Sequence, residues 1–296
     1  MKNYRFSGNK DMLDLDQALR DFRDNPTRYT TDKPVKIKFL HGTDIFSQAQ
    51  AIANLIKSIR VDDPDATFAI LFNQATATTS ALLTDLTRQT KLMDATFKTE
   101  DPQFKLFQQS VLELYQSTFA TRPIHKNEIQ TFCKRVEQSI PKYRFNSSFI
   151  ELLKAFLTTS IKKFPTSMRS EYIVSTLSSE SLHQSLPDVS SRIVATTIHG
   201  AKGLEWDYVI LANFQQEEFP NYYDLLSLGI SSDETHIQVT DANARALSSI
   251  INKLYVGFSR AKKQIYFAYS DKGLKPWGEF DTSISVLTSL PFFSIS

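Results

Sequence analysis

The segment VATTIHGAKGLEWDYVIL, residues 194–211, holds the residues best suited to chemistry. An apolar strand pattern ends in Thr-Thr-Ile-His, two glycines flank Lys202, and Glu205 precedes a second strand pattern. In an open α/β sheet, ligands bind beyond the carboxyl ends of the strands, so we expect Thr197, His199 and Lys202 where a phosphate or another domain would be met. The alternative is a tight, solvent-facing loop in which the glycines serve geometry alone.

A second segment, residues 251–267, carries cations at the end of a helical pattern. Leu254 and Phe258 can pack inward on this helix, and a strand pattern follows the cations. The helix macrodipole stabilises a cation at a helix carboxyl end by about 0.3–1 kcal/mol, so a purely structural role also explains their positions. The cations are Arg260, Lys262 and Lys263.

The glycines argue against one route to nucleotide hydrolysis. A phosphate loop requires two glycines five positions apart, followed by Lys and then Ser or Thr, because main-chain amides must surround the phosphates. None of the eight glycines meets this requirement; Gly200 and Gly203 come closest, but their spacing is wrong and Glu205 follows where Lys is needed. We therefore expect the chain alone not to hydrolyse ATP by this route.

Other polar patterns are given no catalytic or metal-binding role. The sequence DETH, residues 233–236, matches the DExH pattern of a magnesium-binding motif, but the polar run SLGISS precedes it instead of a buried strand, and we expect a surface loop. His41, His125 and His183 share no metal-ligand spacing. The single Cys133 excludes an internal disulfide and a cysteine-based zinc site.

Strand and helix patterns alternate at both ends of the chain and stop in between. From about residue 101 to 187 there are four helical periods without a clear strand. This order predicts an α/β domain, with a parallel sheet and helices on both faces, that is interrupted by an all-α insertion. The predicted strands are residues 35–40, 67–72, 192–198, 208–212 and 264–269.

Basic residues cluster in the predicted insertion, where acidic residues are few. Phosphate neutralisation dominates affinity for duplex DNA, so the cluster could contact a duplex, although a solvated helical face explains it equally well. Aromatic residues at Tyr143, Phe145 and Phe149 could stack on bases, but their spacing favours a core. The basic cluster consists of Arg122, Lys126, Lys134, Arg135, Lys142 and Arg144.

Composition sets broad limits. A length of 296 residues suggests about two domains. A content of 41% hydrophobic and 22% charged residues is typical of globular proteins and excludes fibrous or wholly disordered chains. The formal charge of +2 does not indicate nucleic-acid binding by itself. Apolar runs such as FAILF are far shorter than the roughly 20 residues of a membrane span, and the single cysteine favours the cytoplasm.

Taken together, four segments resemble motifs of the UvrD/Rep family of superfamily 1 DNA helicases, in the family's order. TIHGAKGLEWDYVIL is similar to motif V, and KLYVGFSRAKKQIYF is similar to motif VI. NYRFS at residues 3–7 resembles motif IV, and FQQEEFPN at residues 214–221 resembles the segment after motif V without its usual glycine. The helix before motif VI, ALSSIINKL, lacks the family's usual acidic residues and arginines.

The resemblance implies the C-terminal half of such a helicase. Residues 1–98 and 188–296 would form a RecA-like, P-loop NTPase-like domain (2A), and residues 99–187 a helical insertion similar to domain 2B by position and class. The motifs that hold the nucleotide phosphates and magnesium would lie upstream, in domains 1A and 1B of the same polypeptide. This agrees with the missing phosphate loop.

The motifs also imply roles for single residues. Arg5 and Arg260 are similar to the two catalytic arginines that reach the γ-phosphate across the domain cleft, and Glu205 matches the carboxylate that contacts the ribose. Thr197 and His199 match positions near the single-stranded DNA groove, where hydroxyl and imidazole groups can hold phosphates. The other ATP-binding positions that the motifs imply are Gly203, Lys202 and Tyr255.

The implied function is part of an ATP-dependent DNA helicase or translocase, acting on single-stranded or partly duplex DNA. ATP and Mg²⁺ would bind only in the presence of the upstream domain, and the chain alone would be inactive, with no metal of its own. Two alternatives stay open: a stand-alone DNA-binding or adaptor protein derived from a helicase, and a module whose helical insertion binds a protein. A role in DNA repair is a family-level expectation.

Overall fold

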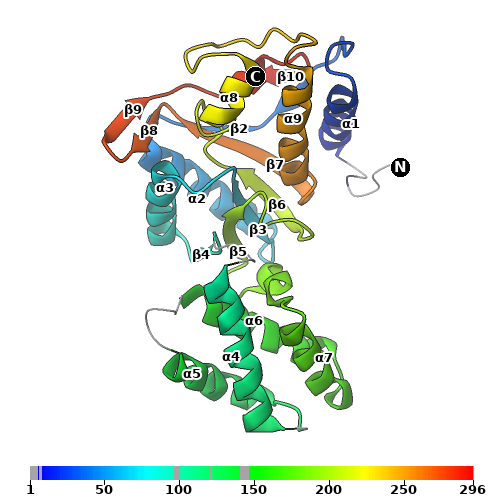
Figure 1. Ribbon diagram of the computed structural model, residues 1–296, viewed down its shortest axis with the longest axis vertical. Helices are drawn as coiled ribbons and strands as arrows, with labels where there is room; N and C mark the ends of the chain where they lie inside the picture. Colours follow the sequence, from blue (N-terminus) through cyan, green and yellow to red (C-terminus); the bar gives the residue numbers. More distant parts are fainter. Residues whose placement is uncertain (1–5, 7–8, 97–100, 121, 141–146, 296) are drawn as a thin grey trace. The chain divides into compact units, whose positions relative to one another are not determined.

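The computed structural model describes residues 6, 9–96, 101–120, 122–140 and 147–295 (Figure 1). It divides into two compact units: Met1–Leu92 with Ala195–Ser296, and Met93–Val194. The insertion expected from the sequence, residues 99–187, falls within the second unit.

A six-stranded sheet has the strand order β2-β7-β6-β3-β5-β4, and four of its strands, β2, β7, β6 and β3, lie wholly within the first unit. The pairs β2–β7, β7–β6 and β6–β3 are parallel. The main-chain N–H of Ile198, just after β5, donates to the carbonyl of Phe72 at the end of β3 (2.8 Å), so β5 runs in the same direction. The predicted α/β class with a parallel sheet is confirmed. The strands are β2 (Phe39–Gly42), β3 (Phe68–Phe72), β4 (Met93–Asp94), β5 (Ile193–Thr197), β6 (Trp206–Leu211) and β7 (Ala261–Ser270).

Helices cover both faces of the sheet, which explains why every residue of β3 is buried. The Arg60 guanidinium of α2 (Ile45–Asp62) lies 5.4 Å from the ring centre of Phe68. A Cβ added at Gly257 of α9 (Ala244–Phe258) would lie 3.8 Å from the Leu71 side chain. Side chains alternate along a strand, so Phe68 and Leu71 point to opposite faces, and α2 and α9 therefore pack on opposite faces.

Two further helices complete these layers, with α3 (Ala77–Gln89) against α2 and α1 (Lys10–Asp24) against α9. A shorter helix, α8 (Tyr222–Leu228), also contacts α9. Side-chain oxygens at four of these helix starts accept the main-chain N–H three residues on, which is the preferred way to satisfy a free donor there. The capping residues are Asn9 of α1, Asp44 of α2, Thr76 of α3 and Asn221 of α8.

The prediction of one strand over residues 35–40 is wrong. The structure has β1 (Val35–Ile37), which pairs with β10 (Phe293–Ile295) in a separate two-stranded parallel sheet, and then β2. The chain changes partners at Lys38, whose carbonyl accepts the main-chain N–H of Phe267 in β7 (3.0 Å). A local sequence pattern carries no information about a partner more than 250 residues away. Helix α1, β10 and the antiparallel hairpin of β8 (Lys272–Lys275) and β9 (Gly278–Asp281) were likewise not predicted.

Helices dominate the second unit, and each of the four predicted helical periods falls within one of them. Aromatic residues supply much of the core: the ring centre of Phe149 lies 5.1 Å from those of Phe104 and Phe107. Phe149 is thus a core residue, as its spacing favoured. Among the described residues, no helix is long and apolar enough to cross a membrane. The elements are α4 (Pro102–Phe119), η2 (Lys126–Glu128), α5 (Ile129–Ser139), α6 (Ser147–Lys163), α7 (Thr166–Ser178) and η4 (Leu182–Asp188).

A polar contact joins the starts of β3 and β6. The main-chain N–H and the hydroxyl of Thr67 both donate to one Asp207 carboxylate oxygen (2.9 Å each), and the Asp207 N–H donates back to the Thr67 hydroxyl (2.8 Å). Burial disfavours the Asp207 charge, but the Thr67 hydrogen bonds and the ammonium groups of Lys263 and Lys262 outweigh it. The pKa of Asp207 is therefore lower than its ordinary value.

We expect Asp207→Asn to lower the free energy of unfolding at pH 7 by about 1 kcal/mol, because hydrogen bonds to a charged acceptor are stronger than those to a neutral one. A lowered folded-state pKa adds stability above the unfolded-state pKa of about 3.9, and that stability disappears as the pH falls through the folded-state value. Urea unfolding between pH 7 and pH 3.5 should show the difference shrink below about pH 4.

Asp281→Asn is the matched control, because this carboxylate is paired with Lys272 but highly exposed. Its effect at pH 7 should stay within about 0.5 kcal/mol. If Asp207→Asn lowered the free energy of unfolding by the same amount at every pH, the lowered pKa of Asp207 would be contradicted.

Candidate functional site

A short loop, residues 198–205, leads from the carboxyl end of β5 to the amino end of β6. The Thr197 hydroxyl accepts the main-chain N–H of Gly200 (3.0 Å) and closes its first turn. A Cβ at Gly200 would lie 2.6 Å from the Thr196 hydroxyl, so a larger residue would force a shift, and Gly203 has a φ of +82°, which disfavours other residues. Both glycines therefore suit the loop geometry.

Arg260 lies where this loop ends. Its guanidinium donates to the carbonyls of Val256 (3.0 Å) and Leu204 (3.3 Å) and to the Ser259 hydroxyl (2.8 Å). The Arg260 carbonyl accepts the main-chain N–H of Trp206 (3.0 Å), which begins the pairing of β6 with β7. The motif V and motif VI segments are therefore joined at the amino ends of two neighbouring strands.

The loop separates the predicted residues into two groups. Glu205 is half-buried and lies between Leu204 and Trp206 in the sequence. Because both of these neighbours form hydrogen bonds with Arg260, the structure brings Glu205 and Arg260 together. Thr197, half-buried, and His199, exposed, lie at the other end, beyond the carboxyl end of β5. Lys202 is exposed in the loop's second turn, where its N–H donates to the His199 carbonyl (3.1 Å).

Tyr255 contacts α1. Its hydroxyl donates to the carboxylate of the buried Asp16 (3.1 Å), and the Arg23 guanidinium lies 5.5 Å from its ring centre. Burial, together with the Asp16 charge, raises the pKa of Tyr255. The contacts of Tyr255 thus hold α1 against α9.

Arg5 lies outside the described residues, but Phe6 and Asn9 contact the motif VI region. Phe6 is buried, and its ring centre lies 5.3 Å from that of Phe258. The Asn9 amide donates to the carbonyl of Lys263 and to the Gln264 side chain (3.0 Å each). Phe6 and Asn9 therefore contact the chain on either side of Arg260 in the sequence.

The segment after β6 builds a buried polar network at the opposite edge of the sheet. The Thr76 hydroxyl lies 3.0–3.1 Å from both carboxylate oxygens of Glu218, and the Asn73 amide donates to the Glu218 carbonyl (2.9 Å). Burial raises the pKa of Glu218, although the hydroxyls of Thr78 and Thr76 oppose the shift. The sequence analysis did not predict that the loop after β3 contacts this segment. The threonines of that loop and Asn73 were the features that could have indicated it.

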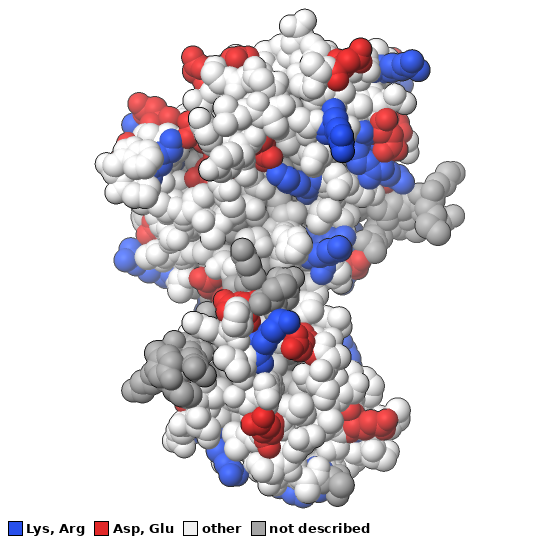
Figure 2. Space-filling view, in the orientation of Figure 1, with Lys and Arg blue, Asp and Glu red and all other residues white. Residues whose placement is uncertain are grey.

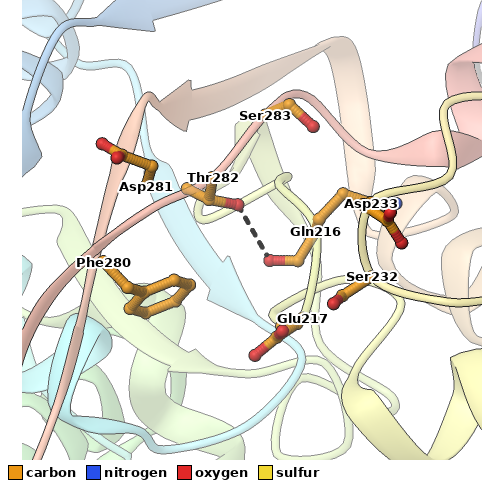
Figure 3. A pocket seen from close by; sticks show the side chains of 8 residues that line it. All are labelled: Gln216, Glu217, Ser232, Asp233, Phe280, Asp281, Thr282 and Ser283. Carbon is orange, nitrogen blue, oxygen red and sulfur yellow. Dashed lines mark hydrogen bonds between the residues drawn. The ribbon is translucent and has the colours of Figure 1, made fainter.

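The DETH sequence lies in an exposed connection, as expected. Asp233 lines a small pocket of about 280 Å³ between that connection, the segment after β6 and the end of β9 (Figure 3). The Asp233 carboxylate accepts the Ser231 hydroxyl (2.5 Å), which lowers its pKa. The described residues contain no group of three His, Cys, Asp or Glu residues that could hold a metal ion.

The basic cluster of the insertion is partly neutralised. Arg122 pairs with Glu128 (2.6 Å), and this guanidinium, with the main-chain N–H of His125, lowers the pKa of Glu128 to about 2. Arg135 donates to the Thr118 hydroxyl (3.1 Å). Acidic and basic side chains are interspersed on the face that Figure 2 shows. Lys126 and Lys134 are exposed, whereas Lys142, Tyr143, Arg144 and Phe145 lie outside the described residues.

Comparison with known proteins gives one family. The model of the UvrD-like helicase C-terminal domain matches residues 47–272, about three quarters of the chain. This range includes the loop 198–205, Arg260 and the whole of the second unit. No curated protein matches the chain significantly.

The raised pKa of Glu218 predicts a pH dependence of stability. A carboxyl whose folded-state pKa exceeds the unfolded value of about 4.3 lowers stability as the pH rises from that value through the folded-state pKa. We therefore expect the free energy of unfolding of the wild type to fall relative to that of Glu218→Gln as the pH is raised from 4 to 8. Parallel pH profiles, measured by urea unfolding, would refute this. Glu279→Gln, at an exposed position, should follow the wild type.

Proposed function

The chain belongs to the UvrD-like helicase C-terminal domain family, and on this premise we propose that it is the second half of an ATP-driven DNA motor. In the proposal, a phosphate-loop domain upstream binds ATP and Mg²⁺, and this chain supplies Arg260 and Arg5 from across the domain cleft. The observation that carries the proposal is the junction of the loop 198–205 with Arg260 at the amino ends of β6 and β7.

The surroundings of Arg260 suit an arginine that acts on a phosphate. The transition state of phosphoryl transfer spreads negative charge over oxygens, and a guanidinium can contact two of them together. The carbonyls of Val256 and Leu204 hold this group at a fixed place while they carry no net charge themselves. Little conformational freedom is then lost when the phosphate arrives. Phe6 packs on Phe258, which supports the proposal that Arg5 acts at the same place.

The other predicted residues divide between two roles. Glu205, beside the Arg260 junction, would accept a hydrogen bond from the ribose, while Gly203 and Lys202 shape the loop. Thr197 and His199, at the other end of the same loop, would contact phosphates of single-stranded DNA. A rigid loop with one function at each end gives a direct route by which DNA contact influences ATP hydrolysis. That loop is closed by the Thr197–Gly200 hydrogen bond and by the Leu204–Arg260 hydrogen bond.

We expect the purified chain to show no DNA-stimulated ATP hydrolysis, because none of its glycine pairs forms a phosphate loop. Phosphate release with and without single-stranded DNA measures this. Arg260→Ala, prepared in parallel, separates intrinsic activity from a contaminant. Turnover by the wild type that Arg260→Ala abolishes would show that the site is complete without a second domain.

With the phosphate-loop domain present, Arg260→Ala should lower kcat for ATP hydrolysis by about 10³–10⁵ at saturating DNA, the effect of losing an arginine finger. Arg260→Lys should restore only part of the rate, since it keeps the charge without the planar fork. His199→Ala should instead weaken DNA affinity and leave basal hydrolysis largely intact.

Arg245→Ala, at an exposed position in the first turn of α9, is the matched control and should change neither quantity. The proposal fails if Arg260→Ala leaves the saturated rate within a few-fold of the wild type while His199→Ala abolishes basal hydrolysis.

A further inference from the structure

A serine just after α9 contacts the guanidinium of Arg260. The Ser259 hydroxyl accepts a hydrogen bond from Arg260 Nη2 (2.8 Å) and donates one to the carbonyl of Val256 (2.9 Å). The same carbonyl accepts a hydrogen bond from Arg260 Nε (3.0 Å). The three groups therefore form a closed ring of hydrogen bonds, in which the serine hydroxyl acts both as a donor and as an acceptor.

The end of α9 fixes this serine before it contacts the arginine. The last carbonyls of an α-helix have no partner within the helix, and Val256 lies in the last turn of α9, which ends at Phe258. The side chains of Ser259 and Arg260 both donate to its carbonyl. The main-chain N–H of Ser259 donates to the carbonyl of Tyr255 (2.8 Å), so the main chain of the serine is held as well.

Each nitrogen of the Arg260 guanidinium has an acceptor. Nε donates to Val256, Nη2 donates to Ser259, and Nη1 donates to the carbonyl of Leu204 (3.3 Å). Three acceptors at three nitrogens determine the plane of the group. None of these acceptors is ionised, so they orient the guanidinium without neutralising its charge. The serine supplies the contact of Nη2, which neither carbonyl provides.

We propose that Ser259 is a positioning residue, which holds the Arg260 guanidinium in the orientation needed to contact the γ-phosphate. This inference rests on the proposed function of Arg260. A guanidinium contacts two phosphoryl oxygens together only when its planar fork faces them, and a misplacement of about 1 Å can lower a rate about 100-fold. Ser259 does not touch the nucleotide in this proposal; it acts through Arg260. The alternative is that the hydroxyl only closes the end of α9.

Nuclear magnetic resonance of the chain itself measures how firmly the guanidinium is held. The Arg260 Nε–H, assigned by its loss in Arg260→Lys, should exchange slowly with water, and its Nη groups should rotate slowly. Ser259→Ala should speed both processes at least about tenfold, because it removes a hydrogen bond to a charged group. Ser259→Thr keeps the hydroxyl and should keep the slow rates. The exposed Arg245 of α9 is the internal reference and should not change.

Kinetics with the phosphate-loop domain present test the consequence. Ser259→Ala should lower kcat for ATP hydrolysis by about 10- to 100-fold and leave KM for ATP within about twofold. Ser259→Thr should restore most of the rate. In an Arg260→Lys background, Ser259→Ala should change kcat by less than about twofold, because lysine lacks the planar fork that the serine holds.

Ser248→Ala is the matched control. It also removes a half-buried serine hydroxyl of α9 that donates to a carbonyl, that of Arg23 (2.8 Å), and it should leave kcat within about twofold of the wild type. Urea unfolding of each variant shows whether the chain is folded under the assay conditions.

The outcomes separate this inference from the proposed function. Ser259 does not position Arg260 if Arg260→Ala lowers kcat as expected while Ser259→Ala keeps the wild-type rate. Unchanged exchange and rotation rates of Arg260 in Ser259→Ala would overturn the inference too. An equal loss of kcat in the wild-type and Arg260→Lys backgrounds would overturn it in favour of a role in the end of α9 alone. If Arg260→Ala has no effect on kcat, the proposed function itself fails, and the inference fails with it.

Discussion

The arrangement of the first unit depends on the hydrogen bonds between Arg260 and the end of the loop 198–205. The Arg260 carbonyl begins the pairing of β7 with β6 at Trp206, and its guanidinium holds the Leu204 carbonyl. Since the other end of the loop is fixed by Thr197 and by the Ile198–Phe72 hydrogen bond, the loop is held at both edges of the sheet. The residues proposed to contact the nucleotide and those proposed to contact DNA therefore lie on one connection held at both ends, which is the physical basis of the proposed coupling.

The rest of the fold supports these two edges. On the amino side, α1 is fastened to α9 through the Tyr255–Asp16 hydrogen bond, and Asn9 holds the main chain just after Arg260. On the carboxyl side, the segment after β6 is anchored to the loop after β3 through the buried Glu218. Buried polar contacts of this kind specify a single arrangement only when their partners are all present, and they rigidify the loops that carry them.

Local patterns predicted the fold class because each depends on neighbouring residues: the continuous apolar run of β3, the helical periods of the second unit, and the sequence of the loop 198–205. Pairings over long distances left no such signal, as with β1 and β10, or Tyr255 and Asp16. The motifs could be found in the sequence, but the contact of Arg260 with Leu204 depends on how β6 and β7 pair, and the raised pKa of Glu218 depends on its burial. Neither property can be predicted from the type of a single residue.

In the proposed motor, Arg260 acts on the γ-phosphate of an ATP held by another domain. A structure of this chain together with its phosphate-loop domain, bound to ADP, Mg²⁺ and aluminium fluoride as a mimic of the transferring phosphoryl group, tests it most directly. We expect the Arg260 guanidinium to lie within hydrogen-bond distance of the fluoride ligands, about 2.7–3.2 Å, with Glu205 near the ribose. If Arg260 keeps its bonds to Val256, Leu204 and Ser259 while other residues contact the fluorides, Arg260 does not act on the γ-phosphate.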